Sequence, residues 1–243
     1  MYVVGSDYGS GTHEWRIEKR NLSDGALITS FGTGGVVTSD PSTSNDKALL
    51  IAIDSSAMYV AGYDSVTAVS AWRIEKRNLS DGALVVSFGT GGVVTGPPIS
   101  HSSFPCGMAI DSSALYLVGR SGGFLGNSTW YTVKRNLSDG ALMTSFGAGG
   151  IIVGSTSTPS SFTLGIAIDT TALYAVGIER SGAGDSEWRI EKRYLSDGAL
   201  VSTFGSGGVV TSNPTTTDDR PLALALDATS LYVAGYAYNP SLS

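Results

Sequence analysis

The chain has 243 residues, only 15% of them charged, and a formal net charge of −6. This acidic balance disfavours a nucleic-acid partner, because neutralising phosphates requires clustered Lys and Arg. The single cysteine, Cys106, allows no disulfide within the chain and no zinc site built from cysteines. The longest apolar run, residues 48–53, is too short to span a bilayer, and residues 1–5 are typical of a strand and not of a signal peptide.

The sequence repeats itself about every 57–58 residues. The recurring residues include four tryptophans, four Phe-Gly pairs and four aspartates: Trp15, Trp72, Trp130 and Trp188; Phe31, Phe88, Phe146 and Phe204; Asp54, Asp111, Asp169 and Asp227. A period of this size is typical of repeat architectures. We expect a single repeat domain over residues 1–243, with units at about 1–46, 47–104, 105–162 and 163–220 and a partial unit at 221–243.

The unit at 47–104 shows the predicted elements in chain order. Residues 48–53 are a continuous apolar run, which predicts a short first strand that is buried on both faces. Asp54 begins a turn, because its side chain can bond the backbone two residues on. Residues 58–62 then predict a second short strand.

The second half of the unit predicts a hairpin. Residues 72–77 alternate as a strand does: Trp72, Ile74 and the stem of Lys76 point one way, and Arg73, Glu75 and Arg77 point the other. Residues 78–82 contain Asp-Gly, the strongest hairpin signal of the unit. Residues 83–88 predict the fourth strand, the glycines at 89–92 break it, and residues 93–94 extend an outer edge.

Four short antiparallel strands in each unit are typical of a β-propeller blade, so we predict an all-β propeller of about four blades. We expect the recurring tryptophans to anchor each blade to the next. Arg73, Glu75 and Arg77 form a charged row that recurs in the first and fourth units but not in the third. We place this row on the outer, wetter rim, because a fully buried row would carry a large desolvation penalty. A parallel β-helix is the rival architecture, but Asp-Gly hairpins make antiparallel pairs.

These residues resemble the delta-60 repeat, a β-propeller repeat family of bacterial and archaeal proteins with no assigned function. The resemblance rests on Phe-Gly-x-Gly-Gly-x-Val at residues 31–37, 88–94 and 204–210, on the apolar strand that ends in Asp, and on the Tyr-Val-Ala-Gly strand. The order of the elements is also similar to that of NHL-type propellers. The resemblance implies a propeller fold over essentially the whole chain and a location outside the cell or at the cell surface.

The predicted units contain one more second strand than any other strand. Residues 1–5 and 231–235 are both second strands, so the chain holds five of these and four of each other strand. Three explanations stay open: the chain is a piece of a longer array, its loose ends pair with a second copy, or one second strand is displaced. An unpaired strand edge invites pairing with another chain. We therefore expect self-association through the terminal strands.

The recurring aspartates are the candidate metal ligands: Asp54, Asp111, Asp169 and Asp227. First strands line the central channel of a propeller, so these carboxylates could form a ring at one mouth and hold Ca²⁺, which prefers several oxygen ligands. The alternative is that each Asp closes its own turn through the Ser or Thr that follows. This second explanation works separately in every unit. No other cofactor is predicted.

The loops differ between units while the strands do not, and loops on a rigid scaffold commonly carry binding. Six aromatic residues in or beside these loops are candidates for contact with a protein or glycan ligand: Tyr63, Phe104, Phe124, Phe162, Tyr236 and Tyr238.

We expect a non-enzymatic propeller that acts as a scaffold or binding module, and we predict no catalytic residue. Repeats that stay nearly identical favour a structural role. One alternative is a carbohydrate-active hydrolase or lyase with its site at the channel mouth, which a pair of carboxylates there would favour. The other alternative is a surface module that a metal ion stabilises.

Overall fold

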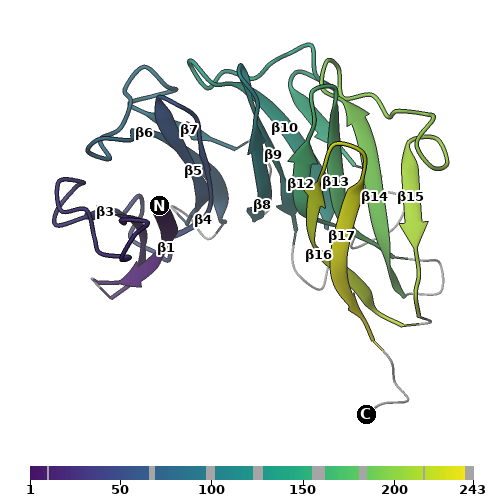
Figure 1. Cartoon of the computed structure of the whole chain (residues 1–243), viewed down its shortest axis with the longest axis horizontal. Coiled ribbons are helices and arrows are strands. Elements are labelled where there is room, and N and C mark those ends of the chain that lie inside the picture. Colours follow the sequence, from purple (N-terminus) through teal and green to yellow (C-terminus); the bar gives the residue numbers. More distant parts are fainter. Residues whose placement is uncertain are drawn as a thin grey trace. The chain divides into compact units, whose positions relative to one another are not determined.

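In a computed structural model of the chain, the described residues are 1–9, 11–65, 69–96, 102–122, 128–154, 162–180, 185–215 and 217–238. None of them is helical, and their 17 strands form five antiparallel sheets (Figure 1). This confirms the all-β prediction. Within these ranges there is no helix of the length and apolar character needed to cross a membrane.

In every sheet the neighbouring strands are consecutive in sequence. The first sheet contains β1 (Tyr2–Tyr8), β2 (His13–Lys19) and β3 (Val36–Ser39). The second contains β4 (Lys47–Ile53), β5 (Ala57–Asp64), β6 (Ala71–Asn78) and β7 (Val93–Thr95), and the third contains β8 (Ser103–Ile110), β9 (Ala114–Ser121), β10 (Thr129–Asn136) and β11 (Ile151–Val153). The fourth contains β12 (Phe162–Ile168), β13 (Ala172–Arg180), β14 (Ser186–Tyr194) and β15 (Val209–Ser212), and the fifth contains only β16 (Asp219–Leu226) and β17 (Leu231–Ala237).

The fourth strand of a complete sheet does not lie where we expected it. Residues 83–88 make a single bridge, through Leu84, and continue as turns. The fourth strand, which pairs with β6 on the side away from β5, is β7. The reason is the glycine-rich element, in which Gly91 and Gly92 have φ values of 62° and 94°. These left-handed conformations suit glycine and turn the chain back after Phe88, so that the following residues reach the sheet edge.

The described residues fall into two compact units. The first comprises residues 1–105 and 136–141, and the second comprises residues 106–135 and 142–243. Each unit has its own cluster of buried apolar side chains.

The core of the first unit lies between the first two sheets. It is built from Trp15, Ile17, Phe31, Ala48, Met58 and Val60. Trp15 and Ile17 share one face of β2 because side chains alternate along a strand. Trp15 is fully buried, and its Nε1 donates a hydrogen bond of 3.2 Å to the carbonyl oxygen of Tyr63 at the end of β5. The tryptophan of one sheet therefore anchors that sheet to the next.

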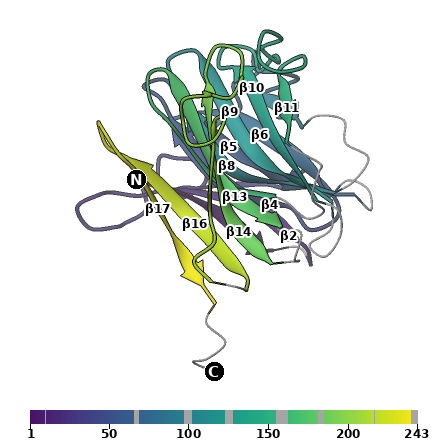
Figure 2. The same ribbon diagram turned by 90° about the vertical axis from the view of Figure 1, so that its right-hand side faces the viewer.

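The second unit ends in a sheet that is less covered than the others. Its core is built from Ala114, Tyr116, Val118, Trp130, Phe146, Leu173, Ala175 and Ile178. In the same unit, β16 packs against β12, β13 and β14 (Figure 2). Among the described strands, β17 pairs with β16 alone, and its side chains Tyr232 and Tyr236 are 57% and 45% exposed.

The first strand of a sheet carries a bulge opposite a glycine. The register of β4 against β5 shifts between Ala48 and Leu50. Gly62 faces this bulge, and a Cβ there would overlap the carbonyl oxygen of Lys47. Gly235 of β17 faces the bulge of β16 in the same way. Only glycine fits at such a close approach of two backbones.

Replacing a buried tryptophan should show that it anchors neighbouring sheets. Trp15 is fully buried, so Trp15→Ala is expected to lower the free energy of unfolding by about 3–5 kcal/mol, through lost burial and the cavity left behind. Val86 is 75% exposed, and Val86→Ala is the matched control, expected to change the value by about 0.5 kcal/mol or less. Guanidinium unfolding followed by circular dichroism measures both. Equal effects would contradict the anchoring role.

Candidate functional site

Each of the four recurring aspartates closes the turn in which it lies. Asp54 Oδ1 accepts hydrogen bonds from the backbone N–H groups of Ser56 and Ala57, at 2.6 and 2.7 Å. Asp54 Oδ2 accepts one from the Tyr59 hydroxyl at 3.1 Å. The same three bonds recur at Asp111, Asp169 and Asp227. Both carboxylate oxygens are thus bound within the turn, and the described ranges hold no group of three or more His, Cys, Asp or Glu suited to a metal ion.

These hydrogen bonds keep the aspartates ionised. Burial raises the pKa of the Asp111 carboxyl, but the N–H groups of Ser113 and Ala114 and further donors lower it more, so the pKa lies below its ordinary 3.8. The pKa is lowered in the same way at two further positions, Asp54 and Asp169. Asp227 is exposed, and the N–H of Thr229 with the other donors of the turn lowers its pKa to about 2.

Three of these aspartates line one hollow in the second unit. The hollow has a volume of about 1170 Å³, and Asp111, Asp169 and Asp227 lie along it. Tyr174 and Lys192 also face it. Three of the four carboxylates that the sequence placed in one ring therefore line one hollow, without forming a cluster suited to a metal ion among the described residues.

Three lysines, Lys19, Lys76 and Lys134, each bind the hairpin that belongs to the following sheet. In the first unit, Lys76 Nζ donates a hydrogen bond of 2.8 Å to the carbonyl oxygen of Leu137. The same ammonium lies 5.3 and 5.9 Å from the ring centres of Tyr59 and Phe88. Gly89 N–H donates a further hydrogen bond of 2.8 Å to the carbonyl oxygen of Asp139 in that hairpin. The ammonium group, the two rings and the backbone N–H thus bind the same hairpin.

We call such a group of one tyrosine, one lysine, one phenylalanine and one glycine a receiving site. We call the hairpin that fills it a docking hairpin. Three receiving sites are filled: Tyr2, Lys19, Phe31 and Gly32 bind residues 78–82; Tyr59, Lys76, Phe88 and Gly89 bind residues 136–140; Tyr116, Lys134, Phe146 and Gly147 bind residues 194–198. Each docked hairpin ends in a glycine: Gly82, Gly140 or Gly198. A Cβ on this glycine would press into the phenylalanine ring of the receiving site. Glycine is therefore needed there for packing as well as for its positive φ.

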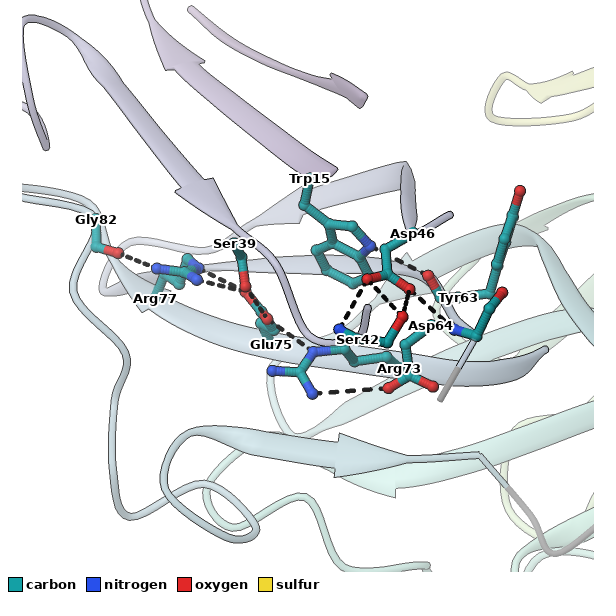
Figure 3. A network of polar contacts seen from close by, with 11 residues as sticks. Trp15, Ser39, Ser42, Asp46, Tyr63, Asp64, Arg73, Glu75, Arg77 and Gly82 are labelled. Atoms are coloured by element: carbon teal, nitrogen blue, oxygen red, sulfur yellow. Dashed lines mark hydrogen bonds and ion pairs between the residues drawn. The ribbon is translucent and has the colours of Figure 1, made fainter. Parts of the chain in front are cut away.

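The glutamate of the charged row is buried in the second and fourth sheets, which corrects our expectation of an exposed rim there, while the row of the first sheet is partly exposed. Glu75 is fully buried, and it accepts hydrogen bonds from Arg73 Nε at 2.8 Å and Arg77 Nε at 2.7 Å (Figure 3). Ser39 of the preceding sheet adds a third bond at 3.0 Å. Arg77 Nη1 also donates to the carbonyl of Gly82 at 2.7 Å, so the row holds the docking hairpin in shape. Partners at both carboxylate oxygens offset the desolvation that we expected to exclude burial.

Sequence reasoning missed the acidic partner that the second strand supplies to this row. Arg73 Nη1 lies 3.8 Å from Asp64 Oδ2 (Figure 3). The equivalent ion pairs are Arg16 with Asp7 at 2.9 Å and Arg189 with Glu179 at 2.6 Å. A signal for this ion pair was present in the sequence. The third unit lacks both partners, since Ser121 stands in place of the acid and Tyr131 in place of the arginine.

Two further buried acids were also missed. Asp46 and Asp219 are fully buried: Asp46 lies just before β4, and Asp219 is the first residue of β16. Asp46 accepts hydrogen bonds from the N–H groups of Ser42 and Ser65, each at 2.9 Å, so it ties together the two loops on either side of a strand pair (Figure 3). Asp219 accepts a bond of 2.9 Å from Thr215 N–H. Their common signal is an Asp followed by Lys or Arg at the start of a first strand.

The candidate loop aromatics form two separate groups. Tyr63 and Phe104 pack edge to face in the first unit, with ring centres 5.1 Å apart. Tyr236 and Tyr238 line a hollow of about 480 Å³ in the second unit, together with Arg220. Two candidates lie outside what the structure describes: Phe124 and the side chain of Phe162.

The lone cysteine is not poised for reaction. Cys106 is partly buried in β8. Burial raises the pKa of its thiol to about 11, although Arg120 acts in the opposite direction. The thiol is therefore protonated at neutral pH, whereas the thiolate is the nucleophile.

No family model matches the chain, and no curated protein matches it. The resemblance to the delta-60 repeat therefore remains a prediction from the recurring residues. Those residues form the turns, the buried charged rows and the docking contacts described above.

Removing the glutamate of a buried row should leave two arginines without their common partner. Glu75→Ala is expected to lower the free energy of unfolding by about 3–5 kcal/mol. Glu18→Ala is the matched control, since Glu18 is 14% exposed and both of its arginines are 34% exposed. There water can replace the lost partner, and we expect about 1 kcal/mol or less. Chemical unfolding of both variants tests the difference, and equal losses would contradict a buried row.

The aspartate turns predict a loss of stability in acid. Each folded carboxyl has a pKa below its unfolded value of 3.8, so its contribution is present above that pH. The contribution is lost as the pH falls from 3.8 towards the folded pKa, which is about 2 at Asp227. Unfolding of the wild type and of Asp111→Asn, measured at pH steps across this window, should show a shallower decline in the variant. Identical slopes would exclude Asp111 as a source of the acid sensitivity.

Proposed function

We propose that this chain is a non-enzymatic scaffold and binding module of the β-propeller type, related to the delta-60 repeat, which acts outside the cell or at its surface and associates with itself through its terminal strands. One observation carries this proposal. The recurring charged residues are engaged in contacts of the fold itself: aspartates in turns, arginines and glutamates in buried rows, and lysines on hairpin carbonyls. The loops are what differs between units, and variable loops on a repeated scaffold are suited to binding.

The sheet packing supports the propeller. Each complete sheet is a meander of four short antiparallel strands, as in a propeller blade. Within the first unit, β4 packs against β1 and β2 of the preceding sheet. Within the second unit, β12 packs against β9, and β16 packs against β12. Repetition of such packing around an axis would produce a ring of blades.

A carbohydrate-active hydrolase or lyase is a second candidate, because Asp111, Asp169 and Asp227 line one hollow. A glycosidase needs one carboxyl with a raised pKa, which protonates the leaving group. Here the pKa of all three carboxyls is lowered by turn donors. A metal-stabilised module would likewise require these oxygens to exchange the donors of the turn for Ca²⁺. The geometry therefore favours the scaffold.

The hollow beside Tyr236 and Tyr238 is the candidate binding site of the second unit. Two tyrosines and the guanidinium of Arg220 offer apolar ring faces together with hydrogen-bond donors. This combination fits a glycan, whose sugar rings carry both apolar faces and hydroxyl groups. We propose a glycan as the ligand.

A glycan array tests this assignment. Tyr238 is 51% exposed, so Tyr238→Ala should leave the fold intact and reduce binding by about tenfold, because it removes one ring of the hollow. Tyr8→Ala is the control, since Tyr8 is 66% exposed and belongs to the first unit. Binding of the wild type and of Tyr8→Ala with loss in Tyr238→Ala supports the assignment. An array on which the wild type binds nothing, or on which both variants lose binding equally, would contradict it.

A further inference from the structure

The outer edge of a sheet is a place where a further strand can add. This edge is formed by β3, β7, β11 and β15, each of which pairs with one neighbour among the described strands. Each of these outer strands is followed in sequence by the next sheet, so such an edge recurs in the interior of the chain.

The outer strands have the composition of strands that pair with other chains. They read Val-Val-Thr-Ser, Val-Val-Thr, Ile-Ile-Val and Val-Val-Thr-Ser, without a charged residue or a proline. Uncharged β-branched strands at an edge are prone to edge-to-edge association, and charges or prolines are common protection against it. These edges therefore need protection of another kind.

The glycine-rich element before each outer strand folds back over the first residue of that strand. In the second sheet, Thr90 N–H donates a hydrogen bond of 2.9 Å to the carbonyl oxygen of Val93, and Val93 N–H donates one of 3.3 Å to the carbonyl oxygen of Thr90. On the other side, the carbonyl oxygen of Gly92 accepts a bond of 3.0 Å from Lys76 N–H of β6. Backbone groups of successive residues in a strand point to opposite edges, so the groups of Val93 point outward. An incoming strand would need groups that are already bound.

The same short hairpin recurs in the other sheets. Its bond from the residue between the glycines to the first residue of the outer strand measures 2.8 Å in each case: Thr33 to Val36, Ala148 to Ile151 and Ser206 to Val209. We call the Gly-x-Gly-Gly segment that forms it an edge strap. The edge straps are residues 32–35, 89–92, 147–150 and 205–208.

The first glycine of each edge strap brings a second piece of backbone against the same carbonyl group. A Cβ on Gly89 would overlap the carbonyl oxygen of Val93. The equivalent overlap exists at the other three straps, for Gly32, Gly147 and Gly205. Such a close approach of two backbone segments requires glycine and leaves too little space for another strand beside this oxygen.

The two glycines at the turn of the edge strap give it its shape. The φ values of 62° and 94° at Gly91 and Gly92 are matched in the other straps by 63° and 96°, 66° and 93°, and 62° and 96°. Positive φ at both central residues is the geometry of a two-residue type I′ turn, which fits the twist of the strands that it joins. Residues other than glycine, asparagine and aspartate are strained in it.

The outer strand also ends soon after the edge strap. β7 ends at Thr95, and Gly96 N–H then binds the carbonyl oxygen of Trp72 at 2.7 Å. By the alternation of the strand, Val93 and Thr95 are the residues whose backbone groups point outward. The edge strap therefore covers one of the two positions at which a new strand would pair.

We propose that each edge strap blocks the addition of a further strand to the outer edge of its sheet, so that copies of this chain do not join edge to edge. The strand that it excludes is the outer strand of a second copy, which has the same uncharged sequence. The edge strap achieves with backbone hydrogen bonds what charges and prolines achieve at other edges.

Gly91 allows a test that alters the edge strap without altering a side-chain contact. Among the described residues, a Cβ on Gly91 meets no atom within 4 Å apart from its chain neighbours. Gly91→Val disfavours the φ of 62°, whereas Gly91→Asn is the matched control, because asparagine tolerates a left-handed conformation. Adding Thr95→Lys to Gly91→Val places a charge at the exposed end of β7 and should block pairing at that edge alone.

Hydrogen exchange of the Thr90 amide reports the opening of the edge strap. We expect Gly91→Val to raise its rate by about tenfold or more, because a β-branched residue is strained in the closed turn. Only the open state can pair, so the concentration at which larger species appear in sedimentation velocity should fall by the same factor. Gly91→Asn, and Gly91→Val combined with Thr95→Lys, should sediment as the wild type does. Thermal melting confirms that each variant is folded.

Several results would overturn the blocking role. Faster exchange at Thr90 in Gly91→Val with the sedimentation of the wild type would show that an open edge strap does not permit pairing. Association that persists after Thr95→Lys, or that is equal in Gly91→Asn, would place the contact elsewhere. An exchange rate at Thr90 that is unchanged in Gly91→Val, or already that of an unfolded chain in the wild type, would show that the turn does not hold the edge closed.

A second sheet serves if Gly91→Val does not fold. Gly149 is the equivalent glycine of the third sheet, and a Cβ there likewise meets no atom within 4 Å among the described residues apart from its chain neighbours. Gly149→Val, its control Gly149→Asn and the added Val153→Lys are then compared by the same measurements, with Ala148 as the amide that reports opening. The same outcomes support or overturn the proposal.

Discussion

The docking of a hairpin onto an ammonium group and two aromatic rings is the contact on which the stacking of these sheets depends. A small antiparallel sheet cannot bury both of its faces alone, so each sheet needs a neighbour. Lys76 provides a charged donor to the hairpin carbonyl while its ammonium lies over the rings of Tyr59 and Phe88. A charge that is shared between rings and a carbonyl is well compensated at a partly buried site. This contact recurs in all three filled receiving sites. In each of them, one sheet binds the hairpin of the sheet that follows it in sequence.

The buried charged rows fix the shape of the hairpin that makes this contact. Glu75 aligns two arginines, and one of them, Arg77, reaches the carbonyl of Gly82 in the docking hairpin. A neutral core would bury the same area, but it would not fix the hairpin carbonyl in place. The row therefore links strand sequence to hairpin shape, and hairpin shape to the packing of the next sheet. The third unit, which has Tyr131 and Val133 in place of the first arginine and the glutamate, shows that this link can be varied in one sheet.

The sequence was sufficient for the all-β class, for repeating units of short antiparallel strands and for the anchoring role of Trp15, because period, alternation and Asp-Gly turns are local signals. It was insufficient for the fourth strand, whose position follows from the positive φ of Gly91 and Gly92 and not from the apolar residues at 83–88. Burial of Glu75 was unpredictable from its own strand, since Asp64 and Ser39 approach from other strands. Asp46 was overlooked because its partners belong to two loops.

The sparse covering of β17 has a kinetic consequence. A strand with one neighbour and exposed side chains opens locally at a free energy far below that of global unfolding. β17 nevertheless satisfies the backbone groups along one edge of β16, which would otherwise be open and able to template aggregation. β17 thus covers the edge of β16 while remaining the part of the second unit that opens most easily.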